Sequence, residues 1–217
     1  MRSFYNRDIN LMRQIFISLV RPHMDYCAQL WAPKEGPLLD KLEKLVYDYT
    51  KLIPEIQNLP YDERLTKMRL QSAQRRYERY SIIYTRKCIT GSVPNIGISV
   101  RRDSKDRNGT KLEIPLSKET SSMRRNSIHI RGPELFNSLP SFLRDLTISQ
   151  DSFKCKLDEY LTMIPDIPRL GIELKSLHSN RLDHVIRQWE WKLHSQPRYP
   201  SNSKSHMSGG AATYLVN

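Results

Sequence analysis

The chain has 217 residues, a length that suits one domain or one domain with a small appendage. Hydrophobic residues make up 38% of it and charged residues 27%, which is leaner than an average globular protein but above the range of disordered chains. Lys and Arg outnumber Asp and Glu by 35 to 23, so the net charge of +12 favours a polyanionic partner without specifying a fold.

Several protein classes are disfavoured by the sequence. No apolar run approaches the roughly 18 residues that a membrane helix needs, and the first residues lack the apolar core of a signal peptide. The three cysteines, Cys27, Cys88 and Cys155, form no CxxC pair, which argues against a disulfide framework or a cysteine-built zinc site. We therefore expect no membrane partner and a reducing intracellular setting, in the nucleus or the cytoplasm.

Residues 1–90 predict a helical region that begins with two amphipathic segments. Apolar residues recur at helical spacing from Asn10 to Arg21, and Pro22 should then break or bend the helix. The face expected to be buried there consists of Leu11, Ile15, Phe16 and Leu19. The clearest helix spans residues 38–53. Its expected apolar stripe is Leu38, Leu42, Leu45, Tyr49 and Leu52.

Two more helices follow before residue 91. A short one is expected over residues 60–69, because Pro60 suits a first helical turn and two acidic residues follow it. Ser72 can cap a longer helix that reaches about Thr90, with Gly91 as its C-terminal stop.

The character of the chain changes at residue 91. Over residues 91–131 the sequence predicts a basic loop and two short strands that pair as a hairpin, because apolar residues alternate in two places. The alternating residues are Leu112, Ile114 and Leu116, then Ile128 and Ile130. Helices return over 132–164, with Phe153, Leu157 and Leu161 on one face. After a proline-marked boundary, an appended helix is expected over 165–195 and a disordered tail over 196–217.

Three stretches of the sequence carry a family resemblance. The first is SLVRPHMDYC at 18–27 with LWAP at 30–33, and the second comprises LEK at 42–44, TKLIP at 50–54 and LPYDERL at 59–65. The third is NSLP at 137–140, followed by SFK at 152–154 and Leu157. In this order they resemble the region just after the catalytic palm in reverse transcriptases of non-LTR (LINE, jockey-like) retrotransposons. The residue before NSLP is Phe136, where the family usually carries Trp.

The resemblance implies a fragment of an RNA-directed DNA polymerase that lacks catalysis. The family holds two Mg²⁺ ions on palm aspartates that include a Tyr-x-Asp-Asp turn, and this chain has no Asp-Asp dipeptide. We therefore expect a mainly α fold: a helical thumb-like bundle, a short β-hairpin element and C-terminal helices. No catalytic residue, metal ligand or cofactor is expected in this chain, since Mg²⁺ belongs to the complete family polymerase.

The candidate binding residues are bases that could contact the phosphates of RNA or DNA without sequence preference. Five lie on the helix predicted over 73–90, where helical spacing matches regularly placed phosphates: Arg75, Arg76, Arg79, Arg86 and Lys87. Tyr77, Tyr80 and Tyr84 interleave with them and either stack on nucleotides or belong to the core. Two further pairs flank the expected strands: Arg101 with Arg102 and Arg124 with Arg125. The alternative is a solvated basic face with ordinary exposed loops.

Two other interpretations stay open. The chain can be a protein–protein interaction module that self-associates, or that binds the missing palm, through apolar surface at Leu11, Ile15, Phe16, Leu30 and Trp31. It can also be a transposon remnant without function.

Overall fold

A computed structural model describes residues 7–101, 109–115, 121–168 and 180–195 of the chain. These residues form a mainly α structure, as the sequence predicts for the fold class. They contain no β-sheet. None of its helices is both long enough and apolar enough to cross a membrane within the described part of the chain.

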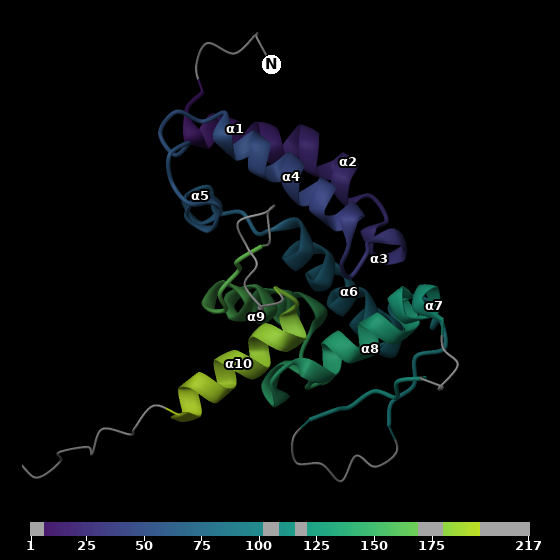
Figure 1. Cartoon of the computed structure of the whole chain (residues 1–217). Coiled ribbons are helices and arrows are strands. Elements are labelled where there is room, and N and C mark those ends of the chain that lie inside the picture. Colours follow the sequence, from purple (N-terminus) through teal and green to yellow (C-terminus); the bar gives the residue numbers. More distant parts are fainter. Residues whose placement is uncertain (1–6, 102–108, 116–120, 169–179, 196–217) are drawn as a thin grey trace, which may run out of the picture.

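The helices fall into an N-terminal set, a central helix and a C-terminal set (Figure 1). The N-terminal set is α1 (Ile9–Ile15), the π-helix η1 (Phe16–Val20), α2 (Arg21–Asp25), α3 (Ala28–Trp31), α4 (Pro37–Lys51) and α5 (Tyr61–Lys67). The central helix is α6 (Ala73–Ile89). The C-terminal set is α7 (Ser122–Asn126), α8 (Ile128–Ser138), the 3₁₀-helix η2 (Ser141–Leu143), α9 (Gln150–Met163) and α10 (Leu182–Ser195).

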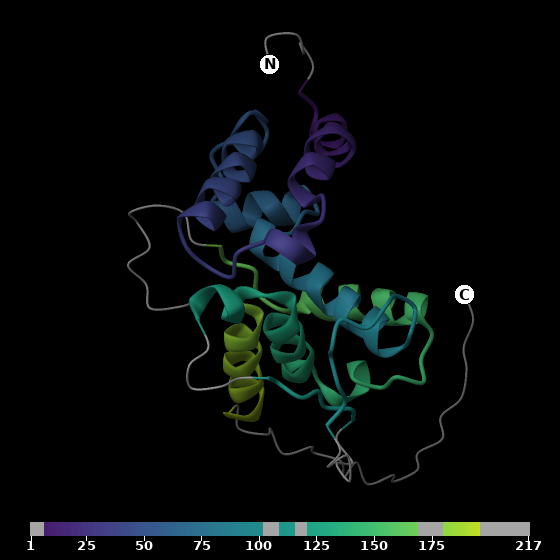
Figure 2. The ribbon, with the colours of Figure 1, turned by 90° about the vertical axis from the view of Figure 1, so that its right-hand side faces the viewer.

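Helix α6 lies between two apolar cores (Figures 1 and 2). The core on the N-terminal side gathers α1, η1, α4 and α5 around Phe16 and Val46, both fully buried. The core on the C-terminal side gathers α8, η2, α9 and α10 around Phe136 and Phe153. A small third cluster joins α3 and α4 to the start of α6 through Ala73 and its neighbours. One helix therefore connects the two halves of the molecule.

The ends of α6 are those that the sequence predicts. Ser72 is the N-cap, and its Oγ accepts a hydrogen bond of 3.1 Å from the N–H of Arg75. The helix ends at Ile89, and Gly91 has a φ of +73°, the left-handed conformation that only glycine adopts without strain.

The first amphipathic segment keeps its helical course through Pro22. The π-helix η1 precedes the proline, and the N–H of Arg21 bonds to the carbonyl of Phe16, five residues back. A π-turn of this kind accommodates the proline, which has no N–H to donate, so the helix changes its hydrogen-bonding pattern and does not end. The predicted apolar face is only partly correct: Phe16 is buried, whereas Leu11 and Leu19 are exposed.

The buried face of α4 matches the predicted stripe only in part. Tyr49 is buried and Leu42 packs against the core, but Leu38 and Leu45 are exposed, and Leu39 and Val46 are buried instead. Both stripes are apolar and helically spaced, so periodicity alone does not separate them. Polar contacts favour the observed face, because Glu43 lies on it and accepts a 2.8 Å hydrogen bond from the N–H of Ala73, in the first turn of α6.

The predicted β-hairpin is wrong. Ile128 and Ile130 lie in the first turn of helix α8, where both are buried, and Leu112 makes only an isolated antiparallel bridge with Val100. Leu116 lies outside the described residues. Two isoleucines separated by one residue also fit a helix start that is buried on more than one side, so their spacing did not identify a strand.

Helix α8 crosses α6 at a glycine. Gly132 is buried in α8, and a Cβ added to it would overlap Oγ1 of Thr85 on α6. The hydroxyl of Thr85 is itself buried and has no hydrogen-bond partner. The crossing therefore depends on the absence of a side chain at residue 132.

Helices α9 and α10 lie within the ranges predicted for them, whereas α8 begins at Ile128, before the predicted start at residue 132. Ser149 caps α9, and Phe153, Leu157 and Leu161 are buried on one face of it. In α10, Leu182 and Ile186 are buried in the same core as α8 and α9, so this helix packs on the main body. The tail predicted over 196–217 lies outside the described residues.

Candidate functional site

Three of the five bases predicted to contact phosphate on α6 are buried inside the protein. The side chains of Arg75 and Arg76 are 0% and 2% exposed, and Arg86 is 1% exposed. They do not form a solvated basic face, so a duplex lying along this helix cannot reach them. For these three residues the prediction of a phosphate-contacting helix face is corrected, because the fold uses their guanidinium groups internally.

Arg86 joins the end of α6 to the segment that leads into α9. Its guanidinium donates to the carbonyls of Asp145 (2.8 Å) and Ile148 and to Oε1 of Gln150 (3.2 Å), and it lies 4.4 Å from the ring centroid of Phe153. Burial lowers the pKa of Arg86. These acceptors are neutral, so the contacts position backbone rather than neutralise charge.

Arg75 belongs to a second internal connection at the start of α6. Its Nη2 donates to the carbonyl of Pro165 (3.1 Å), and its Nε lies 3.9 Å from Asp166. The Asp166 carboxylate also accepts from the N–H and the hydroxyl of Ser72, at 2.8 and 2.7 Å, and from Asn180 at 2.9 Å. One carboxylate therefore ties the cap of α6 to two segments that follow α9.

Arg76 and Arg79 pair with acids on either side of α6. Arg76 Nη2 lies 3.4 Å from Asp25, whose carboxylate also accepts from Arg21 at 3.0 Å and from the Tyr80 hydroxyl at 2.7 Å. Arg79 makes a bidentate pair with Asp158 of α9, with its Nη2 at 2.6 Å. Arg79 is thus accessible only as part of an ion pair.

The remaining predicted bases lie nearer the surface on separate segments. Lys87 is half-buried, and its ammonium group makes no ion pair with another described residue. Arg101 is exposed beside the bridge at Val100, where its N–H donates to the carbonyl of Lys111 (2.9 Å). Arg102 lies outside the described residues. Arg124 and Arg125 are exposed on α7 and make no ion pair within the part of the chain that the structure describes.

Several residues of the stretches that carry the family resemblance make polar contacts within the fold. Tyr61 donates to Glu43 at 2.5 Å, and Arg64 donates to Thr50 at 2.8 Å, so the parts of the second stretch join α4 to α5. Asn137 of the third stretch pairs with both backbone groups of Leu112, at 2.8 and 2.9 Å. These motif residues therefore have structural roles here.

A cleft of about 740 Å³ opens between the N-terminal helices and α9, over one side of α6. The arginines in its lining are Arg13, Arg21, Arg69, Arg76 and Arg79, and the aspartates are Asp62, Asp158 and Asp166. Sequence reasoning missed it as a site, because its arginines come from four segments with no common spacing. Only Arg76 and Arg79 were candidates beforehand, and for a different surface.

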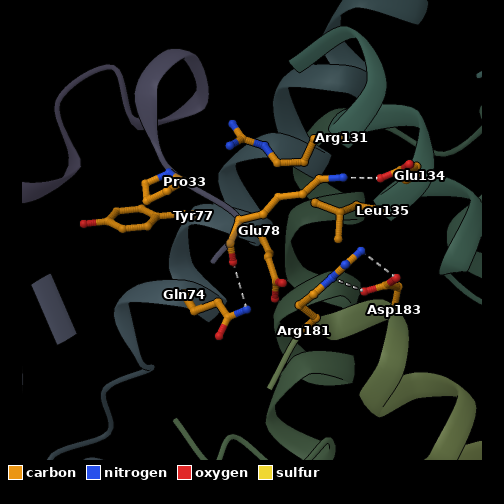
Figure 3. Close-up of a pocket in the computed structure, with 10 residues that line it drawn as sticks. Pro33, Gln74, Tyr77, Glu78, Arg131, Glu134, Leu135, Arg181 and Asp183 are labelled. Carbon is orange, nitrogen blue, oxygen red and sulfur yellow. Dashed lines mark hydrogen bonds and ion pairs between the residues drawn. The ribbon is translucent and has the colours of Figure 1, made fainter. Parts of the chain in front are cut away.

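A smaller cavity, of about 20 Å³, lies between α6, α8 and the start of α10 (Figure 3). Glu78 of α6 and Arg131 of α8 line it, and Arg181 faces Asp183 there at 3.0 and 3.1 Å. One oxygen of Glu78 accepts a 3.1 Å hydrogen bond from the N–H of Leu182, and the other is buried without a partner. Burial raises the pKa of Glu78 to about 7, against the opposing attraction of Arg75.

This carboxyl group should make the folding stability depend on pH. The folded state keeps the Glu78 proton up to about pH 7, whereas the unfolded chain loses it near pH 4.5, so stability falls as pH rises and levels off above pH 7. Between pH 6 and pH 8 the contribution is about 1.4 kcal/mol. Glu78→Gln, which keeps an acceptor for Leu182, should reduce that fall in urea titrations, and the remaining part belongs to Glu43, whose pKa burial also raises to about 7. Parallel curves for the variant and the parent would contradict the assignment.

Neither metal ligands nor known relatives add to this description. Among the described residues no three His, Cys, Asp or Glu side chains gather as a metal site would need. No family model, no curated protein and no solved structure matches the chain.

Proposed function

We propose that the chain is a catalytically incomplete fragment of a non-LTR retrotransposon reverse transcriptase that binds RNA or DNA without sequence preference. The observation that carries the binding part is the pair Arg124 and Arg125, exposed together on α7 and not neutralised by any described residue. Paired arginines on a surface helix can each contact a phosphate. Arg101 and Lys87 add positive charge at the surface.

The polymerase origin is supported by the order of the three motif stretches along the chain. The fragment acts without a catalytic centre or a cofactor, and Mg²⁺ belongs to the complete polymerase with its palm domain. Its setting is the nucleus or the cytoplasm, where its nucleic-acid partners are found.

The double variant Arg124→Ala/Arg125→Ala tests the binding proposal. Two lost phosphate contacts should weaken binding to two unrelated duplexes about equally and should flatten the log–log salt dependence by roughly two units. The measurement is fluorescence anisotropy over a salt series. The matched control is Lys41→Ala/Lys44→Ala, which removes the same charge from exposed positions on α4. If both double variants lose the same affinity, binding follows net charge alone and α7 is not the contact surface.

One observation favours the competing function of a protein-interaction module. Tyr26, Leu30 and Trp31, in and beside α3, are 78%, 64% and 40% exposed, and the Trp31 ring lies 5.5 Å from Tyr77. Of the apolar residues predicted to be exposed, Leu11 at 40% is also at the surface, whereas Ile15 is partly buried and Phe16 is fully buried.

If the α3 surface drives self-association, the mass from light scattering should rise with protein concentration. Tyr26→Glu/Leu30→Glu should restore the monomer mass, because charge at both positions opposes apolar contact. Leu45→Glu, at an exposed position on α4, is the control and should leave the association unchanged. A monomer mass for the parent at high micromolar concentration would exclude this function.

A further inference from the structure

The cleft over α6 brings together cations from four segments that are distant in sequence. Arg13 comes from α1, Arg69 follows α5, and Arg76 comes from α6. Its volume of about 740 Å³ lies within the range of small-molecule sites. Ion pairs on a protein surface form without a cleft, so they do not account for the shape of this one.

Positive charge exceeds negative charge in this cleft. Five arginines line it against three aspartates, and two of those aspartates are already engaged. Asp158 holds Arg79, and Asp166 holds the cap of α6 together with Arg75. Neither Arg13 nor Arg69 makes an ion pair with any described residue. The third aspartate, Asp62, makes no ion pair with a described residue either, so the lining holds two unpaired arginines against one unpaired aspartate.

Guanidinium groups at the cleft also have buried N–H donors without acceptors. Nε of Arg13 has no hydrogen-bond partner, and neither does Nε of Arg76, whose Nη2 lies 3.4 Å from Asp25 and whose side chain is only 2% exposed. Arg76 shares the single carboxylate of Asp25 with Arg21. Buried donors left unpaired destabilise a fold, and the positive charge of the guanidinium groups that carry them favours an anion in the cleft.

The backbone at Arg69 is a second sign of a functional constraint. Arg69 has a φ of +51°, in a turn where the N–H of Leu70 bonds to the carbonyl of Leu65, the position at which helix ends favour glycine. A long side chain in the left-handed conformation costs free energy that glycine would avoid. The exposed Arg69 side chain lines the cleft, so the strained backbone presents a cation there.

We propose that this cleft binds a phosphomonoester of a small organic molecule, such as a nucleotide, between Arg13 and Arg69 with Arg76 as its floor. The surplus of arginines attracts a phosphate dianion, and guanidinium groups are suited to bind it by paired hydrogen bonds. Leu65, Leu161 and Ile164 are also in the lining and can contact the organic part. This site is separate from the α7 surface on which the proposed function rests.

Isothermal titration calorimetry on the full chain tests the proposal with three probes: adenosine 5′-monophosphate, inorganic phosphate and adenosine. The nucleotide should bind most tightly, inorganic phosphate more weakly and adenosine most weakly. This order separates a site for an organic phosphate from one for the free ion. No binding of the nucleotide or of phosphate at millimolar concentrations would overturn the proposal.

Arg69→Gly is the decisive variant, because glycine adopts the observed φ and the fold should keep its stability while losing the cation. Nucleotide affinity should fall at least tenfold in Arg69→Gly and in Arg13→Gln, whereas Lys67→Ala, which removes a nearby exposed charge outside the cleft lining, should bind like the parent. Parent-like binding by Arg69→Gly would overturn the assignment.

Duplex binding of Arg69→Gly should equal that of the parent, since it depends on α7. If duplex binding is instead lost in this variant and the duplex displaces the nucleotide, the cleft is a nucleic-acid site and the small-ligand proposal is wrong.

Discussion

Arg86→Ala is expected to lower the free energy of unfolding by about 4 kcal/mol, although alanine is the best helix former. The substitution leaves the carbonyls of Asp145 and Ile148 without their donor and opens a cavity beside Phe153. Urea denaturation followed by circular dichroism measures the loss. The sequence predicts a phosphate contact at this residue, and the buried geometry predicts a stability effect instead.

Lys87→Ala is the matched control for Arg86→Ala, since it removes the same charge from the next residue of the same helix. The Lys87 ammonium makes no ion pair with a described residue, so this variant should stay within about 0.5 kcal/mol of the parent. If the two variants lose equal stability, the loss reflects helix charge and not the contacts of the Arg86 guanidinium.

Gly132→Ala is expected to cost about 3 kcal/mol, because its methyl group would occupy the position of Thr85 Oγ1 where α8 crosses α6. Glycine to alanine in an ordinary helix interior is favourable by up to about 1 kcal/mol, so the sign of the effect identifies the close crossing. Thermal or urea unfolding gives the value.

The partner substitution Thr85→Ala should rescue Gly132→Ala. It removes the overlapping hydroxyl, which has no hydrogen-bond partner, and leaves the Thr85 Cβ at 3.4 Å and Ile128 Cδ1 at 3.5 Å from the added methyl group. A double-mutant cycle should therefore show a coupling energy of about 2 kcal/mol between the two positions. Additive losses would place the strain of Gly132→Ala somewhere other than this contact.

Local signals in the sequence predicted those features that local chemistry determines. Ser72 and Gly91 set the ends of α6, and Phe153, Leu157 and Leu161 define the face of α9, because caps and apolar periodicity act within a few turns of chain. The strand prediction at Ile128 and Ile130 was wrong because two apolar residues are too short a pattern to distinguish a strand from a buried helix start.

The fate of the arginines could not be predicted locally. The acceptors of Arg86 lie 59 to 64 residues away along the chain, and most are backbone carbonyls, which every residue type carries. The sequence of a helix with five bases and one acid therefore indicates a solvated helix, even where the fold buries three of the bases. The cleft could not be predicted from the sequence either, because only tertiary packing brings Arg13 and Arg69 into the lining of one cavity.

Helix α6 also determines how the molecule comes apart. It packs against the N-terminal helices through Ala73, Tyr77 and the contact of Arg76 with the Phe16 ring, and against the core around Phe153 through Ile82 and Arg86. Because each half loses packing when α6 unfolds, we expect the two halves to unfold as one cooperative unit rather than as independent foldons. A destabilising substitution in either half should therefore lower the stability of both halves. The amides in the middle of α6 should be among those most protected against hydrogen exchange.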